Sequence, residues 1–353
     1  MRSARAANHG KAPARERALG QARFVPRVLL LSLLLAACDS SPPSAPEAPP
    51  FDPLLSETAL LDHLNFLAAD SLYGRGVGSE HERRAAEYIR DRFQEHGLEP
   101  GDTSYLQTVP LPFPVNGQTG ATSQNVLGVL PGEGRLAGQW LILGAHYDHL
   151  GFQWVSADWV IVYNGADDNA SGTALMLEVA HYLSDQLAGV RGVDGRRSIM
   201  FQAYGAEEAG LIGSDYFCEH PTVPMDSIVA MLNLDMVGRL RDNVLILVGT
   251  SSSAEWTDLV AAANGTSSLW FGLDDALLGR SDQACFYQRQ RPVLFLHTGL
   301  HDEYHTPYDD VWLINTQGML RVGNLAIALL QDLAVRPQRL IFGDVALEFA
   351  EQR

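Results

Sequence analysis

Residues 140–149, WLILGAHYDH, form the stretch that decides the fold. The apolar run Trp140–Ala145 is followed at once by His146 and Asp148. A short, continuous apolar run is typical of a strand buried on both faces, as in parallel sheets. In such sheets, ligands bind beyond the carboxyl ends of the strands. The stretch therefore predicts a buried strand that delivers an imidazole and a carboxylate to a functional crevice.

The rest of the chain alternates apolar runs with helical patterns. Five further runs rich in Val, Ile and Leu predict strands over Asn125–Leu130, Ser198–Ala203, Ile228–Leu234, Val244–Val248 and Pro292–His297. Apolar residues at helical spacing predict helices over Glu57–Ala69, Glu80–His96, Ala170–Gln186, Ala254–Ala263 and Thr316–Ala334. This alternation favours an α/β fold with a mainly parallel sheet covered by helices on both faces. Functional residues are expected just after the strands.

Charge is spread unevenly over the 353 residues. The chain has 25 Lys and Arg against 42 Asp and Glu, a formal net charge of −17. Residues 1–37 hold seven basic residues and one acidic residue, so the remainder carries 18 basic and 41 acidic groups. Because nucleic-acid binding needs basic surface, this excess argues against a nucleic-acid partner and favours cations. Lys11 is the only lysine, which excludes Schiff-base lysine chemistry and a P-loop.

Residues 1–37 have the features of a signal peptide. A basic stretch precedes the apolar run Val28–Ala37, which is too short to span a bilayer. The run ends in Leu35-Ala36-Ala37-Cys38, which resembles the bacterial lipobox, where the cysteine is lipidated and becomes the first mature residue. We therefore expect an exported protein anchored to a lipid bilayer of the bacterial cell envelope through Cys38, on a periplasmic or extracellular face.

Residues 38–53 are rich in Pro, Ser and Ala, a composition that cannot bury a core and predicts an extended tether. Residues 54–353 contain no second linker and no repeat, which favours one domain. Export permits disulfides, and the remaining cysteines are Cys218 and Cys285. Pairing and buried free thiols both remain open from the sequence.

Imidazoles and carboxylates follow other predicted strands besides Trp140–Ala145. They are Asp167 and Asp168 before a helix, the pair Glu207 and Glu208, Asp235, and Tyr304 with His305. Each alone has an ordinary explanation; Asp167 and Asp168, for example, suit a helix N-terminus. Their joint occurrence at strand ends predicts a metal site at one edge of the sheet. Mixed nitrogen and oxygen ligands favour zinc or a similar divalent ion.

The motifs that carry these residues resemble those of the M28 family of zinc aminopeptidases. They are GAHYDHLG (144–151), NGADDNASG (164–172), GAEEAGLIGS (205–214), NLDMVG (233–238) and EYHTPYDD (303–310). The likeness extends upstream through residues 70–89 and covers residues 57–335. It implies a three-layer α/β sandwich around a mixed, mostly parallel sheet. Tyr105–Pro114 runs almost directly into Asn125, which leaves no room for the protease-associated insert of many members.

The resemblance also implies a role for each site residue. His146 and Asp235 would hold one zinc ion, Glu208 and His305 a second, and Asp167 would be shared by both. Relatives join the aspartates at positions 167 and 168 by a cis peptide bond, which places Asp168 next to the metal ligands.

Three further roles follow from the same resemblance. Glu207 would be the general base that accepts a proton from the attacking water. Tyr304 would stabilise the oxyanion, and Asp148 would orient the imidazole of His146 through its other ring nitrogen. Asp282 corresponds to an acidic residue near the site in relatives, and no role is assigned to it.

The expected activity is hydrolysis of N-terminal residues from peptides with a free N-terminus, with two zinc ions per chain. One alternative is a single-zinc acyl transferase of the glutaminyl cyclase type, and another is a non-catalytic, receptor-like binding domain. The loop Phe152–Tyr163 contains Trp154, Trp159 and Tyr163, which could line an apolar subsite or simply lie at the surface.

Overall fold

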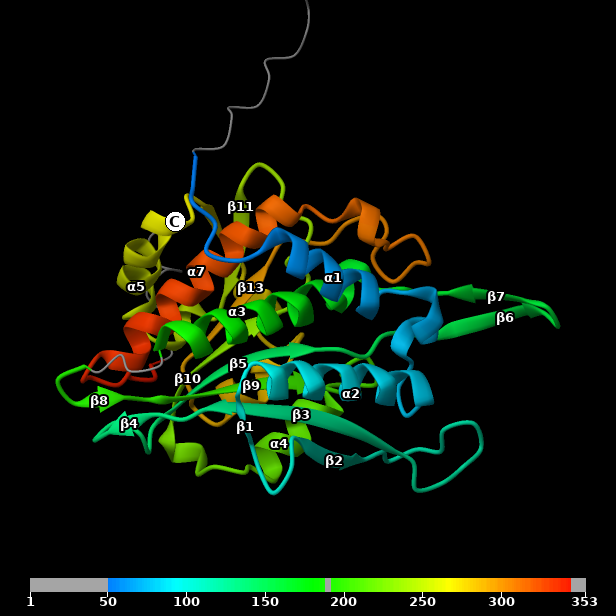
Figure 1. Cartoon of the computed structure of the whole chain (residues 1–353), viewed down its shortest axis with the longest axis horizontal. Coiled ribbons are helices and arrows are strands. Elements are labelled where there is room, and N and C mark those ends of the chain that lie inside the picture. The colour runs from blue at the N-terminus through cyan, green and yellow to red at the C-terminus, as the bar shows by residue number, and fades with distance from the viewer. Residues whose placement is uncertain (1–49, 188–191, 344–353) are drawn as a thin grey trace, which may run out of the picture. The chain divides into compact units, whose positions relative to one another are not determined.

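The computed structural model describes residues 50–187 and 192–343 (Figure 1). The description that follows concerns the described residues of the unit Ala45–Arg353. The predicted signal peptide and Cys38 lie outside the described residues, as does most of the predicted tether, of which residues 50–53 are described.

Four parallel strands form the centre of the main sheet. In spatial order they are β9 (Ser198–Tyr204), β5 (Trp140–His146), β10 (Ile228–Leu234) and β13 (Val293–His297). Because they are parallel, their carboxyl ends meet at one edge of the sheet. The predicted run Trp140–Ala145 is therefore a central strand, and the residues that follow all four strands lie at the same edge.

Antiparallel pairing occurs towards both sides of this sheet. Strand β3 (Thr122–Leu130) pairs antiparallel with β9 and carries β1 (Glu99–Pro100) and β2 (Leu106–Pro110). On the other side β11 (Val244–Val248) is antiparallel to β13 and parallel to β12 (Trp270–Leu273). The predicted mixed, mostly parallel sheet is confirmed.

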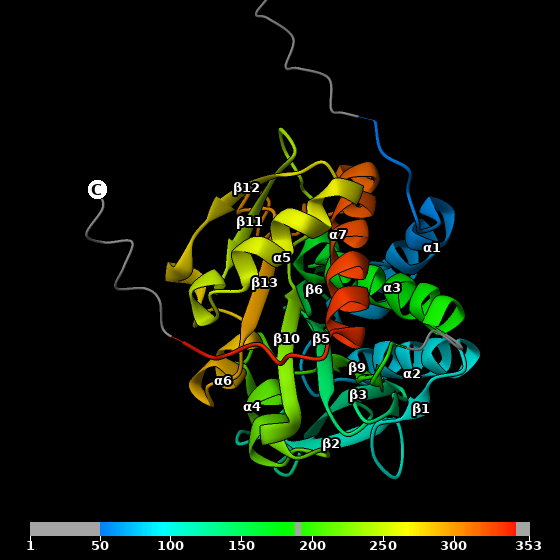
Figure 2. The same ribbon diagram turned by 90° about the vertical axis from the view of Figure 1, so that its left-hand side faces the viewer.

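Helices cover both faces of the sheet. They are α1 (Glu57–Leu67), α2 (Glu80–Glu95), α3 (Gly172–Leu187), α4 (Ile212–Glu219), α5 (Trp256–Ala263), α6 (Gln283–Gln288) and α7 (Thr316–Val335). Figure 2 shows α4 and α6 on one side of the strands and α2, α3, α5 and α7 on the other. In β5, Leu141 and Leu143 pack into the larger core, whereas Ile142 packs into the smaller core on the opposite face. The three-layer architecture follows from strands that are apolar on both faces.

Two helices show why the sequence forms these elements. In α2 the Ser79 hydroxyl accepts a hydrogen bond from the Glu82 amide at 3.1 Å, and Ala85, Ile89 and Phe93 form a buried stripe at helical spacing. Helix α7 has the length and composition of a membrane-spanning helix, but most of it is buried. It packs against α1, α3 and α5, so it is a core helix of this fold.

The cysteines that the sequence left open form a disulfide. Cys218 and Cys285 are bonded at an S–S distance of 2.08 Å and join α4 to α6. A covalent link over 67 residues of sequence restricts the unfolded chain and so stabilises this face of the sheet.

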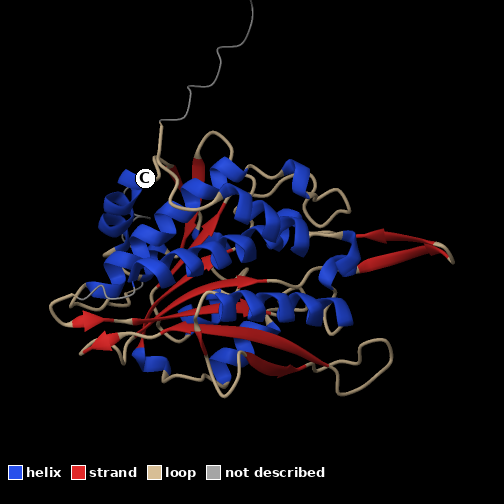
Figure 3. Ribbon diagram, in the orientation of Figure 1, coloured by secondary structure: helices blue, strands red, loops and turns tan. Residues whose placement is uncertain are grey.

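Two small ribbons lie outside the main sheet. Strands β4 (Glu133–Gly134) and β8 (Gly195–Arg196) form one of them. The predicted loop Phe152–Tyr163 is instead a hairpin of β6 (Phe152–Ser156) and β7 (Trp159–Val162), which extends away from the helices and the main sheet (Figures 1 and 3).

Candidate metal centre

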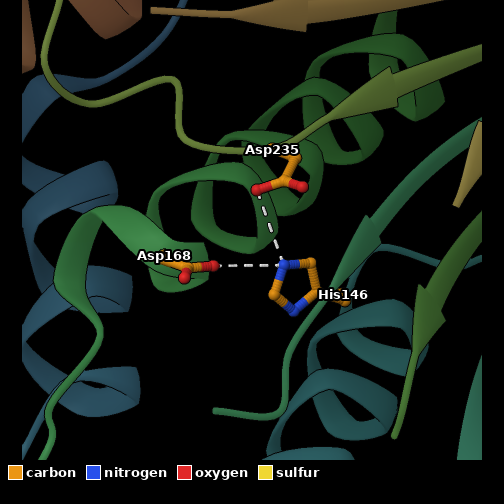
Figure 4. A group of neighbouring side chains, drawn as sticks. All are labelled: His146, Asp168 and Asp235. Atoms are coloured by element: carbon orange, nitrogen blue, oxygen red, sulfur yellow. Dashed lines mark ion pairs between the residues drawn. The ribbon is translucent and has the colours of Figure 1, made fainter. Parts of the chain in front are cut away.

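One group of donor atoms lies at the carboxyl ends of β5 and β10. His146 is the last residue of β5, Asp235 follows β10, and Asp168 lies in the turn before α3. The Nε2 atom of His146 lies 3.3 Å from Oδ1 of Asp168 and 3.5 Å from Oδ1 of Asp235 (Figure 4). His146 is almost fully buried, and the three side chains come from segments far apart in the sequence. They form the first donor group.

A second donor group lies on the other side of Asp168. The Nε2 atom of His305 lies 3.0 Å from Oδ2 of Asp168 and 3.2 Å from Oε2 of Glu208. Nδ1 of His149 lies 2.7 Å from Oε1 of Glu208 and 3.7 Å from Oδ2 of Asp168. The two oxygens of Asp168 therefore face different donor groups, which is the arrangement of a carboxylate shared between two ions.

The expectation for Asp167 does not agree with this geometry. Its Oδ1 accepts a hydrogen bond from the Gly238 amide at 2.6 Å, and its Oδ2 lies 3.3 Å from Nε2 of His301. The cis peptide bond joins Asp168 to Asn169, one residue later than expected. The position between the two groups belongs to Asp168, which the sequence placed only beside the ligands.

Asp309 holds the turn that presents Asp168. Its carboxylate accepts hydrogen bonds from the amides of Asp167, at 2.9 Å, and Asp168, at 3.0 Å. Burial raises the pKa of Asp309, and the carboxylate of Asp167 adds to this effect. The side chain of Asn169 donates to the Leu234 carbonyl at 2.9 Å, which ties the same turn to the end of β10. Asp309 is part of the motif EYHTPYDD, but the sequence gave no role to it.

Asp148 holds the turn that presents the two glutamates. Its carboxylate accepts hydrogen bonds from the amides of Glu207, at 3.0 Å, and Glu208, at 3.1 Å. Oδ1 of Asp148 lies 3.7 Å from Nδ1 of His146, beyond hydrogen-bond distance. The contact to His146 predicted from the sequence is therefore close but weak, and the main contacts of Asp148 are with the backbone after β9.

Arg75 is a buried support that sequence reasoning missed. Its guanidinium donates hydrogen bonds to the carbonyls of Tyr147 and Asn164, each at 2.7 Å, and of Gly165 at 3.0 Å. It thereby joins the backbone after His146 to the backbone before Asp167. Burial lowers the pKa of Arg75 to about 10, which the nearby carboxylates of the site counteract. The available signal was its place in the upstream segment 70–89.

Several carboxylates converge here and shift the titration of their neighbours. Burial raises the pKa of Glu207 well above its usual value; His146 opposes this effect, and Asp282 and Asp235 add to it. Burial alone would lower the pKa of His305, but the carboxylates of Asp168 and Glu208 raise it to about 10. Negative charge is thus concentrated where the two donor groups meet.

Asp282 and Tyr304 are affected by burial in the same direction. Burial raises the pKa of the fully buried Asp282 to about 7. Burial, with Asp168 and Glu208, also raises the pKa of Tyr304, which keeps its hydroxyl protonated and able to donate a hydrogen bond. The Tyr304 ring stacks on His305 at 3.8 Å between ring centroids.

A cavity of about 510 Å³ opens onto both donor groups. It is lined by Asp168 and by the predicted site residues His146, Glu207, Glu208, Asp235, Tyr304 and His305. Trp154 and Trp159 of the hairpin do not line it and are exposed. The cavity therefore joins the predicted catalytic residues to the predicted ligands, whereas the hairpin aromatics lie at the surface.

The fold and this site define a metallopeptidase-like protein. The model of peptidase family M28 matches residues 125–330, and the chain belongs to this family. Among curated relatives, aminopeptidase YwaD of Bacillus subtilis is 28% identical over 231 residues, which cover 63% of this chain and 47% of the relative. The chain spans about half the length of the curated relatives it matches.

Solved structures share the fold at lower identity. The zinc aminopeptidase BSAP of Bacillus subtilis aligns with a TM-score of 0.62 at 19% identity, over 82% of this chain and 99% of that one. The glutaminyl cyclase of Porphyromonas gingivalis aligns with a TM-score of 0.61 at 19% identity, over 80% and 99%. At these identities both comparisons support the architecture alone. The choice between aminopeptidase and glutaminyl cyclase activity depends on the residues of the site.

Proposed function

We propose that this protein is a zinc-dependent aminopeptidase that removes N-terminal residues from peptides. The observation that carries the proposal is the position of Asp168, whose two carboxylate oxygens face two separate donor groups. His146 and Asp235 would complete a site for one ion, and Glu208 and His305 a site for another. The family and the names of its aminopeptidase relatives support the peptide as substrate.

The donor set fits zinc. Each site combines imidazole nitrogen with carboxylate oxygen, the ligands that zinc accepts in catalytic sites. In each of the groups His146, Asp168, Asp235 and His149, Asp168, Glu208, the donor atoms lie within 4.8 Å of one another. Converging carboxylates repel one another, and bound cations would relieve that repulsion. His149 was not predicted, and its contact with Glu208 would orient that carboxylate.

The residues of the cavity supply the remaining parts of a hydrolytic reaction. Bound zinc would supply Lewis acidity that lowers the pKa of a water molecule and polarises the scissile carbonyl. Glu207 accepts the proton from the attacking water and later returns it to the departing amine. The Tyr304 hydroxyl donates a hydrogen bond to the carbonyl oxygen as that oxygen gains negative charge. The substrate ammonium group is attracted by the acidic side chains of the cavity.

Two assays on the purified, zinc-loaded protein test this function. Leucine p-nitroanilide reports aminopeptidase activity, and a peptide with N-terminal glutamine reports cyclisation with release of ammonia. We expect hydrolysis of the anilide and no cyclisation. Cyclisation without anilide hydrolysis would replace the proposal by the glutaminyl cyclase alternative. Absence of both activities from a folded, zinc-loaded protein would favour the non-catalytic alternative.

We also propose that the protein is anchored to the bacterial cell envelope through a lipid on Cys38. The sequence before Cys38 supports this location, and it lies outside the described residues. Expression of the full chain and of a Cys38→Ser variant tests it, with phase partition in a mild detergent as the measurement. We expect the parent chain in the detergent phase and the variant in the aqueous phase; equal partition would contradict the anchor.

A further inference from the structure

Arg280 lines the same cavity as the two donor groups. Among the residues that line it in the described part of the chain, Arg280 is the only arginine, and no lysine is present. The other charged groups of the lining are the carboxylates of Asp168, Glu207, Glu208 and Asp235, together with imidazoles. The cavity therefore has acidic groups at the predicted catalytic centre and one permanent positive charge elsewhere on its wall.

The loop that carries Arg280 is fixed to the strand that positions Asp235. The Arg280 amide donates to the Leu277 carbonyl at 2.9 Å, just after the 3₁₀ turn η6 (Asp275–Leu277). The neighbouring Ser281 is buried, and its hydroxyl accepts a hydrogen bond from the Asn233 side chain at 2.8 Å. Asn233 belongs to β10 and precedes Asp235 by two residues. These contacts thus fix the backbone at Arg280 relative to the first donor group.

A second side chain secures this loop. The Gln283 carbonyl oxygen accepts a hydrogen bond from Asn233 at 2.9 Å, and its amide donates to the Leu278 carbonyl at 2.9 Å. Both Asn233 and Gln283 are fully buried. A guanidinium on a loop fixed in this way loses less conformational freedom when it binds a ligand than one on a mobile loop.

The side chain of Arg280 is exposed, and none of the carboxylates in the described residues forms an ion pair with it. Two other arginines, Arg135 and Arg239, do form such pairs. Arg135 pairs with Asp194 at 2.6 Å, and Arg239 pairs with Glu303 at 2.9 Å. A guanidinium binds carboxylates in a two-pronged geometry that an ammonium group cannot reproduce. Arg280 is available for such a contact from the substrate.

We propose that Arg280 binds a carboxylate of the substrate, so that the site favours peptides whose carboxylate can reach it. This inference rests on the proposed aminopeptidase function and names its substrate class. The substrate ammonium group is attracted by the acidic centre, and the carboxylate by the arginine at another part of the wall. An extended peptide spans about 3.3–3.6 Å per residue, and pockets of roughly 300–1,000 Å³ hold drug-sized ligands. The cavity is therefore of a size for a dipeptide or tripeptide.

The carboxylate has two chemical sources, and paired substrates distinguish them. Leu-Leu and Leu-Leu-amide differ only at the chain terminus. Leu-Glu-amide and Leu-Gln-amide differ only at the side chain of the second residue. For each pair, the ratio of kcat/KM for the charged to the neutral member measures recognition of that carboxylate. The measurement is made on the zinc-loaded protein and on Arg280→Gln and Arg280→Lys.

We expect the parent protein to favour the charged member of at least one pair, and Arg280→Gln to reduce that ratio by about tenfold or more. Arg280→Lys should restore part of it, since it keeps the charge but loses the two-pronged geometry. Arg83→Gln is the matched control, because Arg83 lies on the exposed face of α2 and its loss changes the net charge equally. Its ratios should equal those of the parent protein.

Two outcomes would overturn the inference. In the first, neither ratio changes in Arg280→Gln although all four substrates are cleaved. In the second, Arg83→Gln lowers the ratios as much as Arg280→Gln, which would assign the effect to net charge. Both leave the aminopeptidase function intact. Failure of that function is distinguished by the absence of cleavage of the neutral amides and of leucine p-nitroanilide by the parent protein.

Discussion

Glu207 lines the cavity onto which both donor groups open, and its neighbour Glu208 belongs to one of them. The Glu207 amide is held by Asp148, so the side chain of Glu207 is positioned without being part of either donor group. Its proposed task is to move a proton, which a neutral amide of the same shape cannot do.

Glu207→Gln should therefore keep its bound zinc and lose about 10²–10⁴-fold in kcat on leucine p-nitroanilide. Metal analysis and steady-state kinetics on the same sample check both parts. Full activity of the variant would refute the assignment of the base, whereas loss of zinc would show that Glu207 acts as a ligand.

A matched pair of variants distinguishes the role of Asp168 from that of Asp167. Asp168→Asn removes the shared negative charge and should lower retained zinc to one ion per chain or fewer. Asp167→Asn keeps an oxygen for the Gly238 amide and should retain the ions of the parent protein. Metal analysis after dialysis is the measurement. The opposite result, with zinc lost only from Asp167→Asn, would restore the sequence-based expectation.

The sequence drew attention to these residues because most of them follow directly after strands, and their roles as ligands stay predictions. His146, Glu208, Asp235 and His305 each come within 3.5 Å of another donor atom. Asp167 and Asp168 are adjacent, and the backbone of the turn decides which side chain faces the cavity. That backbone is fixed by Asp309 and Asn169, contacts between distant segments that no local pattern reveals.

At the scale of elements, α2 buries an acidic side chain, Glu82, on the same face as its apolar stripe. The Glu82 carboxylate accepts hydrogen bonds from the Ser123 hydroxyl at 2.5 Å and the Gly78 amide at 2.6 Å. Burial raises the pKa of Glu82 from 4.5 to about 8, and the nearby Asp148 adds to this effect. A carboxyl with a higher pKa in the folded state holds its proton more tightly when folded.

The contribution of the Glu82 carboxyl to the free energy of unfolding is therefore complete below about pH 4.5 and is lost as the pH rises towards about 8. The side chain at position 82 stays neutral in Glu82→Gln. The melting temperature of this variant minus that of the parent protein should therefore increase by about 2 °C or more from pH 5 to pH 8. Glu80→Gln, an exposed change on the same helix, is the control. A difference between Glu82→Gln and parent that does not vary with pH would contradict the prediction.

Elements were predicted where burial leaves a pattern in the sequence. All six predicted strands and all five predicted helices are confirmed, with ends that agree to within three residues. The hairpin of β6 and β7 was missed because every residue of β6 is exposed, so no buried face marks it. Helices α4 and α6 have eight and six residues, too short for a clear periodicity.

At the scale of the whole molecule, the proposed ions connect the loops after β5, β9, β10 and β13. Ligands that bind only the folded state stabilise it, by about 2.7 kcal/mol per site at a concentration 100 times Kd. Removal of zinc with a chelator should therefore lower the melting temperature by about 5 °C or more. Asp168→Asn should show a smaller shift. An unchanged melting temperature of the parent protein would count against ions that hold these loops together.

The most direct test of the two-ion account is a titration of the metal-free protein with zinc. Bound zinc and hydrolysis of leucine p-nitroanilide are measured at each point. The account predicts that the metal-free protein is inactive and that full activity returns as two zinc ions bind per chain. Full activity before any zinc is added, or a folded protein that binds none, would contradict it.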